Sequence, residues 1–244
     1  MRRVKKTEGT FVEISYQIKG GDGVAHTFIV RFDRQTLEQK FDAVAAPAWA
    51  ALETDKCAGC PLNVHDHPFC PAARSLAAVI PVAIPMVSYS RVEVEVAIEG
   101  RVVHAEVTVQ DAMSSLIGLC MATSGCPNLA FLKPMARFHV PFATMAETIF
   151  RATSSFLLGR YFQKKATGEE NFSLSGLESA YGRLHEVNVG MARRLRRVSE
   201  GDANLNAIVK LDMFAQNLPY AIRDELESLA PYYIHVIQEK ETLD

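Results

Sequence analysis

Residues 91–109, RVEVEVAIEGRVVHAEVTV, decide the fold class of this chain. Apolar side chains alternate with polar or small ones on both sides of a Glu99-Gly100 pair. A period of two, interrupted by a short glycine-containing turn, predicts a β-hairpin with one buried and one solvated face. The residues of the expected buried face are Val92, Val94, Val96, Ile98, Val103, Ala105, Val107 and Val109.

A similar pattern near the N-terminus predicts another hairpin. Residues 19–23, KGGDG, supply its turn. A hairpin alone is marginally stable in water, so we expect the two hairpins to join in one antiparallel sheet with a solvated face. The alternating apolar residues are Val12, Ile14, Tyr16 and Ile18 before the turn and Phe28, Val30 and Phe32 after it.

A short helix is expected at about residues 72–80, between the two hairpins. After the second hairpin the rest of the chain is predicted to be helical. Residues 111–122 are apolar nearly all round, which indicates a buried helix. Thr144 and Glu147 form a capping box, and a helix is expected from there to about residue 163. Further helices are expected to begin at Ser175 with Glu178, at Asp202, and with Pro219 in the first turn of the last one.

This order of elements, strands followed by helices, predicts an α+β fold in which an antiparallel sheet of two β-hairpins packs against a helical layer. We expect one compact domain over residues 1–244. Its sheet-rich part, 1–110, carries a cysteine-rich metal loop at 57–71, and its helical part is 111–244.

Composition and charge limit the partners and the cellular compartment that we expect for the protein. A formal net charge of −2 gives no electrostatic case for nucleic acid or an anionic membrane. The N-terminus has no apolar stretch typical of a secretory signal, and the longest apolar run, 75–89, is too short to span a bilayer. We therefore expect a soluble cytoplasmic protein. In that compartment thiols stay reduced, so clustered cysteines are expected to be ligands or catalysts rather than disulfides.

The loop CAGCPLNVHDHPFCP, residues 57–71, holds three of the five cysteines. The thiolates of Cys57 and Cys60, spaced as C-x-x-C, can converge on one ion, and ligands from other turns can complete a tetrahedron. Cys60, Cys70 and the distant Cys126 each precede a proline, which restricts the preceding residue to extended backbone and fixes the direction of its thiol. Together these features predict a metal or cluster site at Cys57, Cys60, Cys70 and Cys126.

The sequence leaves open whether the site holds a zinc ion or an iron–sulfur cluster. Zinc is narrowly favoured, because structural zinc is the commoner use of four cysteines in a mixed fold. A 4Fe–4S cluster used for electron transfer or redox chemistry is the alternative, since cysteine followed by proline is familiar from bacterial cluster-binding runs. A thiol-redox pair of Cys57 and Cys60 is a third hypothesis, and purely structural thiols are a fourth.

For several other residues the sequence allows both an ordinary structural role, which we expect, and a functional role at the metal site. His65 and His67 are expected in an exposed loop, with metal ligation as the alternative. Cys120 lies in the apolar stretch 111–122 and is expected to be a buried bystander. His139 is expected to be a hydrogen-bonded core histidine, and the alternative is a hydrogen-bond donor to the metal ligands or a general base near the site.

The helix expected after Ser175 carries two further features. Asn188 falls on its apolar stripe and is expected to be a buried polar residue that fixes the packing register. The basic run at 193–197 is expected to complement the helix dipole, with a phosphate or partner surface as the alternative. The apolar members of the stripe are Leu177, Tyr181, Leu184, Met191, Leu195 and Val198.

Four segments give the chain a family resemblance: CAGCPL at 57–62, CPAA at 70–73, MATSGCP at 121–127 and KPMARFHVP at 133–141. In these the chain resembles an uncharacterised bacterial family described as a domain of unknown function. The resemblance implies that Cys57, Cys60, Cys70 and Cys126 are motif positions and Cys120 is not. It also implies a cytoplasmic setting, and it implies no activity.

Familiar catalytic and nucleotide-binding motifs are missing from the sequence, including the P-loop, G-x-G-x-x-G, G-x-S-x-G and H-E-x-x-H. No catalytic residue and no organic cofactor site is therefore assigned, and whether the protein is an enzyme stays open. A protein partner and the oligomeric state stay open as well.

Overall fold

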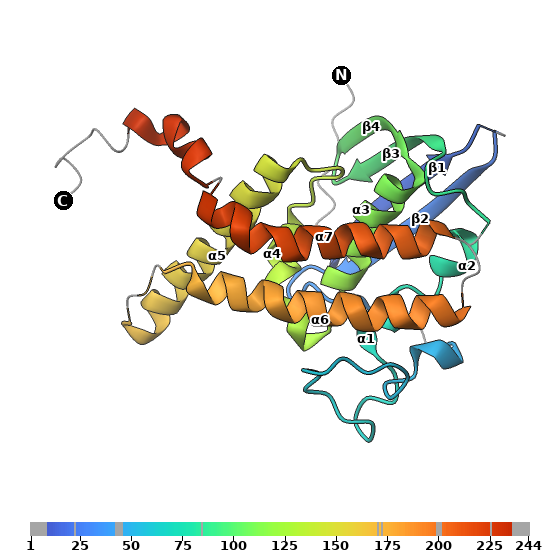
Figure 1. Ribbon diagram of the computed structural model, residues 1–244, viewed down its shortest axis with the longest axis horizontal. Coiled ribbons are helices and arrows are strands. Elements are labelled where there is room, and N and C mark those ends of the chain that lie inside the picture. The colour runs from blue at the N-terminus through green and yellow to red at the C-terminus, as the bar shows by residue number, and fades with distance from the viewer. Residues whose placement is uncertain are drawn as a thin grey trace.

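The structure is a computed structural model, and it describes residues 9–21, 23–41, 46–83, 85–169, 171, 173–198, 202–224 and 226–235 (Figure 1). Both predicted hairpins are confirmed, and they form one antiparallel sheet in the order β2-β1-β3-β4. The strands are β1 (Phe11–Lys19), β2 (Ala25–Asp33), β3 (Arg91–Ile98) and β4 (Arg101–Thr108). The hairpins join through antiparallel pairing of β1 with β3, in which Tyr16 lies opposite Val96.

One face of this sheet is buried as the alternation predicts. Every apolar position expected on that face in β1, β2 and β3 is at most 7% exposed. The expected inward residues of β4 are only partly buried. The turn between β3 and β4 places Glu99 at φ 40° and Gly100 at φ 86°, as a tight hairpin turn requires.

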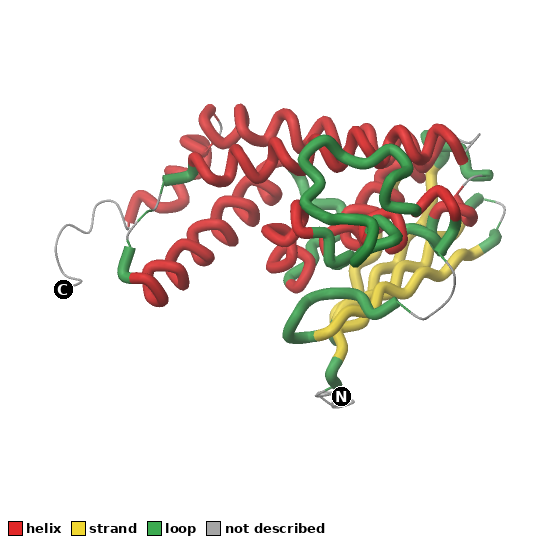
Figure 2. The backbone as a smooth tube through the Cα atoms, turned by 90° about the horizontal axis from the view of Figure 1, so that it is seen from below, coloured by secondary structure: helices red, strands yellow, loops and turns green. Residues whose placement is uncertain are grey.

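Helices make up the rest of the fold, which confirms the α+β class. Figure 2 shows that they gather on one side of the sheet, and Figure 1 shows α6 and α7 running side by side. The longer helices are α3 (Val109–Ala122), α5 (Met145–Thr167), α6 (Ser175–Val198) and α7 (Asp202–Asp224). The short ones are η1 (Ala48–Ala50), α1 (Pro71–Ser75), α2 (Ile80–Ala83), η2 (Pro127–Leu132), α4 (Lys133–Arg137) and η3 (Leu226–Tyr233).

The predicted start of α5 is confirmed by its cap. The Glu147 amide donates to Thr144 Oγ1 over 3.2 Å, and the Thr144 amide donates to Glu147 Oε2 over 2.7 Å. This reciprocal pair satisfies main-chain donors that have no partner within the helix. The helix continues past residue 163 and ends where Gly168 adopts φ 78°, a left-handed C-cap.

Two helix boundaries differ from the sequence-based expectation. The helix expected at 72–80 is two short helices, because the chain leaves α1 at Leu76 and re-enters a helix at Ile80, where Pro81 is tolerated in the first turn. The helix expected to begin around Pro219 is wrong, since α7 runs without a break to Asp224.

The main core lies between the sheet and the helices α3, α6 and α7. A smaller apolar cluster is formed by Ile149, Ala152, Leu177, Tyr181 and Ala215, from α5, α6 and α7. Leu184 packs against both clusters and joins them. The single domain over residues 1–244 stays a prediction.

Two polar residues predicted to be buried are buried. Asn188 is 1% exposed, and neither of its side-chain polar atoms has a hydrogen-bond partner among the residues that the structure describes. His139 is 8% exposed, and its Nε2 lies 2.5 Å from the Tyr16 hydroxyl, which also lies 2.8 Å from Ser115 Oγ. These bonds tie the sheet to α3 and to the segment that follows α4.

The buried state of His139 makes stability depend on pH. Burial lowers the pKa of His139 from 6.5 to about 3, and the nearby Arg151 lowers it further in the same direction. Between these two values the unfolded chain binds a proton that the folded chain excludes, so stability falls as pH drops through this window. Near pH 4 the loss relative to neutral pH should reach roughly 3 kcal/mol.

We expect His139→Gln to flatten this part of the stability profile, measured by urea unfolding between pH 7 and pH 4. His104→Gln is the matched control, because His104 is exposed on β4. The same slope with pH in the His139 variant and the unmodified chain would contradict the prediction.

Candidate functional site

The cysteine loop leaves and rejoins the fold at one place. The Leu52 amide donates to the Pro68 carbonyl over 2.9 Å, and the Cys70 amide donates to the Ala50 carbonyl over 2.8 Å. Residues 53–67 therefore form a closed excursion, which Figure 2 shows as a loop crossing the helical layer. The side chains of His65 and His67 are exposed on it, as expected.

The C-x-x-C turn is held between α6 and η2. The Cys60 amide donates to the Cys57 carbonyl over 3.1 Å and closes the turn. The Gly59 amide donates to Glu186 Oε2 over 3.0 Å, and the Gly59 carbonyl accepts from Asn128 Nδ2 over 3.0 Å. Glu186 and Asn128 therefore fix the turn from two sides.

Cys70 and Cys126 occupy equivalent local positions. Each is extended, with φ and ψ of −68° and 119° for Cys70 and −64° and 123° for Cys126, and each immediately precedes a short helix. In each case a proline begins that helix, which confirms the extended backbone expected at these Cys-Pro steps. Both cysteines are buried.

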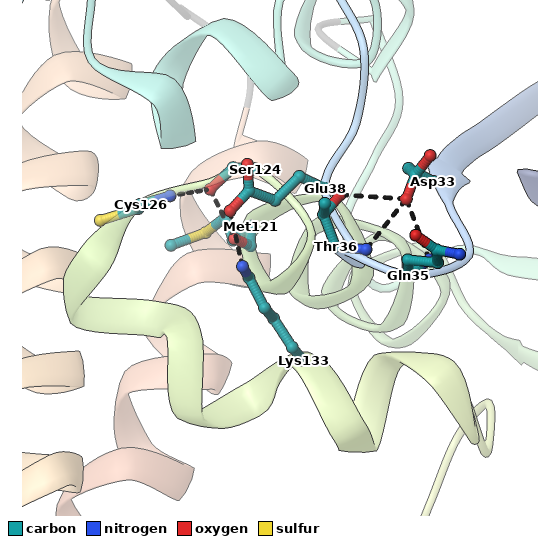
Figure 3. Close-up of polar contacts among 8 residues, drawn as sticks. All are labelled: Asp33, Gln35, Thr36, Glu38, Met121, Ser124, Cys126 and Lys133. Atoms are coloured by element: carbon teal, nitrogen blue, oxygen red, sulfur yellow. Dashed lines mark hydrogen bonds and ion pairs between the residues drawn. The ribbon is translucent and has the colours of Figure 1, made fainter.

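The turn that presents Cys126 is fixed by its neighbours (Figure 3). Ser124 Oγ accepts from the Cys126 amide over 3.2 Å and donates to the Met121 carbonyl over 2.7 Å. Gly125 adopts φ 85°, a conformation that favours glycine. The segment after β2 packs over this turn, where Lys133 pairs with Glu38 at 2.6 Å.

The thiols of the four predicted ligands influence one another. Burial raises the pKa of Cys57 to about 11, and the Cys70 and Cys60 thiols raise it as well. Burial raises the pKa of Cys126 to about 12, with further increases from Cys70 and Cys57. Cys120 is different, because burial alone raises its pKa to about 12. The interacting pairs are Cys57 with Cys60, Cys57 with Cys70, and Cys126 with Cys57 and Cys70, whereas no other thiol contributes to the shift at Cys120.

Main-chain donors also reach this region. The amides of Asn128 and Leu129 lower the pKa of Cys126 against the effect of burial, and the Leu129 amide donates to the Cys126 carbonyl over 3.0 Å. Nearby N–H groups favour the thiolate over the thiol. Across the described residues, however, no group of three or more His, Cys, Asp or Glu side chains is arranged to hold a metal ion. Cys57, Cys60, Cys70 and Cys126 therefore do not form a coordination sphere in this conformation.

Sequence reasoning missed Arg194, which anchors the loop. Its guanidinium is 1% exposed and donates to the carbonyls of Trp49, Ala51 and Leu52 over 2.7, 2.7 and 3.0 Å. Its positive charge also lowers the pKa of Cys57. The sequence predicted only that the basic run complements the helix dipole, and it did not predict the burial of Arg194. The signal in the sequence was its place four residues after Gly190, on the buried face of α6.

Gly190 allows α6 to approach the loop closely. A Cβ atom at this position would lie 3.1 Å from Cys57 Sγ and 3.2 Å from the Asp55 carbonyl oxygen. On the exposed side of the same helix, Arg197 pairs with Asp55 at 2.6 Å. The loop next to Cys57 is thus held by close packing, by a buried cation and by a surface ion pair.

Comparison with known proteins places the chain in a family. A family described as a domain of unknown function (DUF6901) matches residues 14–234, and the chain belongs to it. This agrees with the expected class of family. No curated protein and no solved structure matches the chain.

The described helices were also compared with the requirements of a membrane span. None of them alone is long and apolar enough to cross a bilayer. The pair Val109–Ala122 and Pro127–Arg137, bent by 114°, meets the length and composition criteria only when taken together.

Removing the buried guanidinium should destabilise the protein far more than removing an exposed one. Arg194→Met leaves three main-chain carbonyls without their donor, so we expect a loss of about 3 kcal/mol or more in the free energy of unfolding. Arg197→Met is the matched control on the same helix and should have a much smaller effect. Urea unfolding of both variants measures the difference, and equal losses would refute the anchoring role of Arg194.

Proposed function

We propose that the chain is a cytoplasmic metal-binding protein in which Cys57, Cys60, Cys70 and Cys126 hold one zinc ion. The observation that supports the proposal is that the thiol of Cys126 interacts with Cys57 and Cys70, and Cys57 with Cys60, although Cys126 lies far along the chain from the loop that holds the other three. Four cysteine thiolates are a common ligand set of structural zinc. Cys120 lies outside the proposed ligand set.

The surroundings of the thiols suit a negatively charged metal–thiolate centre. Zinc with four thiolates carries net negative charge, so it is stabilised by nearby donors and cations. The amides of Asn128 and Leu129 supply donors at Cys126, and the buried guanidinium of Arg194 supplies a positive charge near Cys57. Neither feature is required if the thiols serve only to fill space.

Metal binding in this proposal is coupled to local ordering. The thiols are not at ligand spacing in the described conformation, so the loop and the Cys126 turn must draw together around the ion. Burial raises the pKa values of Cys57 and Cys126, so binding must also release protons from these thiols. Closure would tie the loop to the end of α3.

The proposed role is structural or interaction-based rather than catalytic. Four thiolates complete a tetrahedral sphere and leave no position for a reacting water. The alternative is a 4Fe–4S cluster held by the same four cysteines, in an electron-transfer or redox protein. The buried Cys-Pro steps at Cys70 and Cys126 favour this alternative, because cysteine followed by proline also occurs in cluster-binding runs.

Metal analysis of protein purified without oxygen tests the proposal. We expect a colourless sample with one zinc ion per chain, whereas broad absorption near about 400 nm would identify an iron–sulfur cluster. Cys57→Ser, Cys70→Ser and Cys126→Ser should each lower the metal content, and Cys120→Ala is the matched control. Full metal content in all three serine variants, or loss of metal in Cys120→Ala, would refute the ligand set.

Removal of the metal should loosen one part of the protein selectively. The loop at 57–71 has few large apolar side chains, so its order should depend on the site. We expect chelation, or Cys70→Ser, to increase amide hydrogen exchange in residues 57–71 and 120–130 while α5 and α6 keep their protection. Equal protection of the loop with and without chelator would show that the thiols are incidental to its structure.

A further inference from the structure

A cavity of about 360 Å³ lies away from the proposed metal ligands, and none of the five cysteines lines it. Its walls come from α3, α4, α5, α6, α7 and the segment after α4, elements that surround the middle of the molecule in Figure 1. Most of the lining is apolar, including Leu119, Leu132, Met135, Leu211 and Phe214. A space of this size and character is typical of a small-molecule site.

One polar wall of the cavity is uncharged at neutral pH. Ser115 and His139 line it, and both are hydrogen-bonded to the Tyr16 hydroxyl. Burial lowers the pKa of His139 to about 3, so the imidazole is neutral at neutral pH. Burial also raises the pKa of Tyr16, so the phenol keeps its proton. This wall can accept or donate a hydrogen bond but offers no charge to a ligand.

A second polar wall holds two charges that cancel. Lys210 donates to Asp111, and both residues line the cavity. Burial raises the pKa of Asp111, but the hydrogen bonds from Lys210 and Thr108 and the positive charge of Lys210 together hold it below its ordinary value. The carboxylate is therefore ionised and paired with the ammonium group, and this wall contributes no net charge.

Arg151 is the remaining charge in the lining. Its Nη2 donates to the Met135 carbonyl over 2.7 Å and to the Phe138 carbonyl over 3.4 Å. No carboxylate in the described part of the chain forms an ion pair with it. Glu147 lies one turn earlier on α5, and its negative charge raises the pKa of Arg151 against the effect of burial. Its carboxylate is hydrogen-bonded to the amide and hydroxyl of Thr144, and Glu147 does not line the cavity. The residues that line the cavity are therefore mostly apolar and carry one excess positive charge.

We propose that this cavity binds a small monocarboxylate with an apolar body of about ten carbon atoms, and that Arg151 binds its carboxylate. The size follows from the volume: at about 30 Å³ for each non-hydrogen atom, the cavity holds about a dozen such atoms. The charge follows from the excess positive charge in the lining, because a guanidinium in an apolar site favours a planar carboxylate partner. The proposal does not depend on the metal site.

Three probes that share a ten-carbon tail test the proposal on the unmodified protein. Decanoate, decanol and decyltrimethylammonium differ in the charge of the head group, and isothermal titration calorimetry measures their affinities below the concentrations at which they aggregate. We expect decanoate to bind about tenfold or more tightly than decanol, and the cation to bind most weakly. Equal affinity for all three probes, or no binding of decanoate, would overturn the proposal.

A pair of variants tests the role of Arg151. Arg151→Gln keeps a donor for the Met135 carbonyl but removes the charge, so the preference for decanoate over decanol should disappear. Arg183→Gln is the matched control, because Arg183 is exposed on α6 and does not line the cavity. A preference for decanoate that survives in Arg151→Gln would overturn the assignment. If Arg151→Gln does not fold, Arg151→Lys must keep the preference, and its loss there would overturn the assignment equally.

Discussion

The buried face of the sheet must be covered by another element, and α3 is the helix that covers it. This helix contacts β3 and β4 on one side and α7 on the other, so it lies in the middle of the molecule. That position explains why its sequence is apolar nearly all round, and why most of its residues are buried. The other helices pack outward from α3, and the positions of both candidate sites depend on it.

Each end and face of α3 contributes to a different part of the molecule. Its C-terminal end leads into the turn that presents Cys126, where Gln39 Nε2 binds the Cys120 carbonyl over 2.9 Å. Ser115, nearer its start, bonds to Tyr16 of the sheet. Gly118 and Leu119 face the apolar cavity. The same buried helix therefore leads into the turn that carries Cys126 and contributes residues to the lining of the cavity.

The parts of the fold that depend on local pattern could be predicted from the sequence. The two hairpins follow from alternation, and the start of α5 follows from a capping box, because these signals act between residues close in the chain. The position of Arg194 could not be predicted in the same way, since a basic run at a helix end is usually solvated. Only the loop carbonyls, which come from residues near position 50, make its burial favourable.

The candidate sites show the same division. The spacing of the cysteines and their prolines predicted four ligands, and the extended backbone expected at Cys70 and Cys126 is present. Their distances could not be predicted, because these depend on how α6, η2 and the loop pack together. No sequence motif predicted the cavity. Its lining is drawn from five helices and from the segment after α4, so no local stretch of sequence encodes it.

The anchoring of the cysteine loop by Arg194 also bears on how the protein is made. Arg194 follows Trp49 by 145 residues, so the loop leaves the ribosome long before its anchor exists. At about 5–20 residues per second, the loop carbonyls wait on the order of ten seconds for their donor. During that interval the three thiols of the loop are not yet covered by α6. The loop can reach its final place only when α6 is complete.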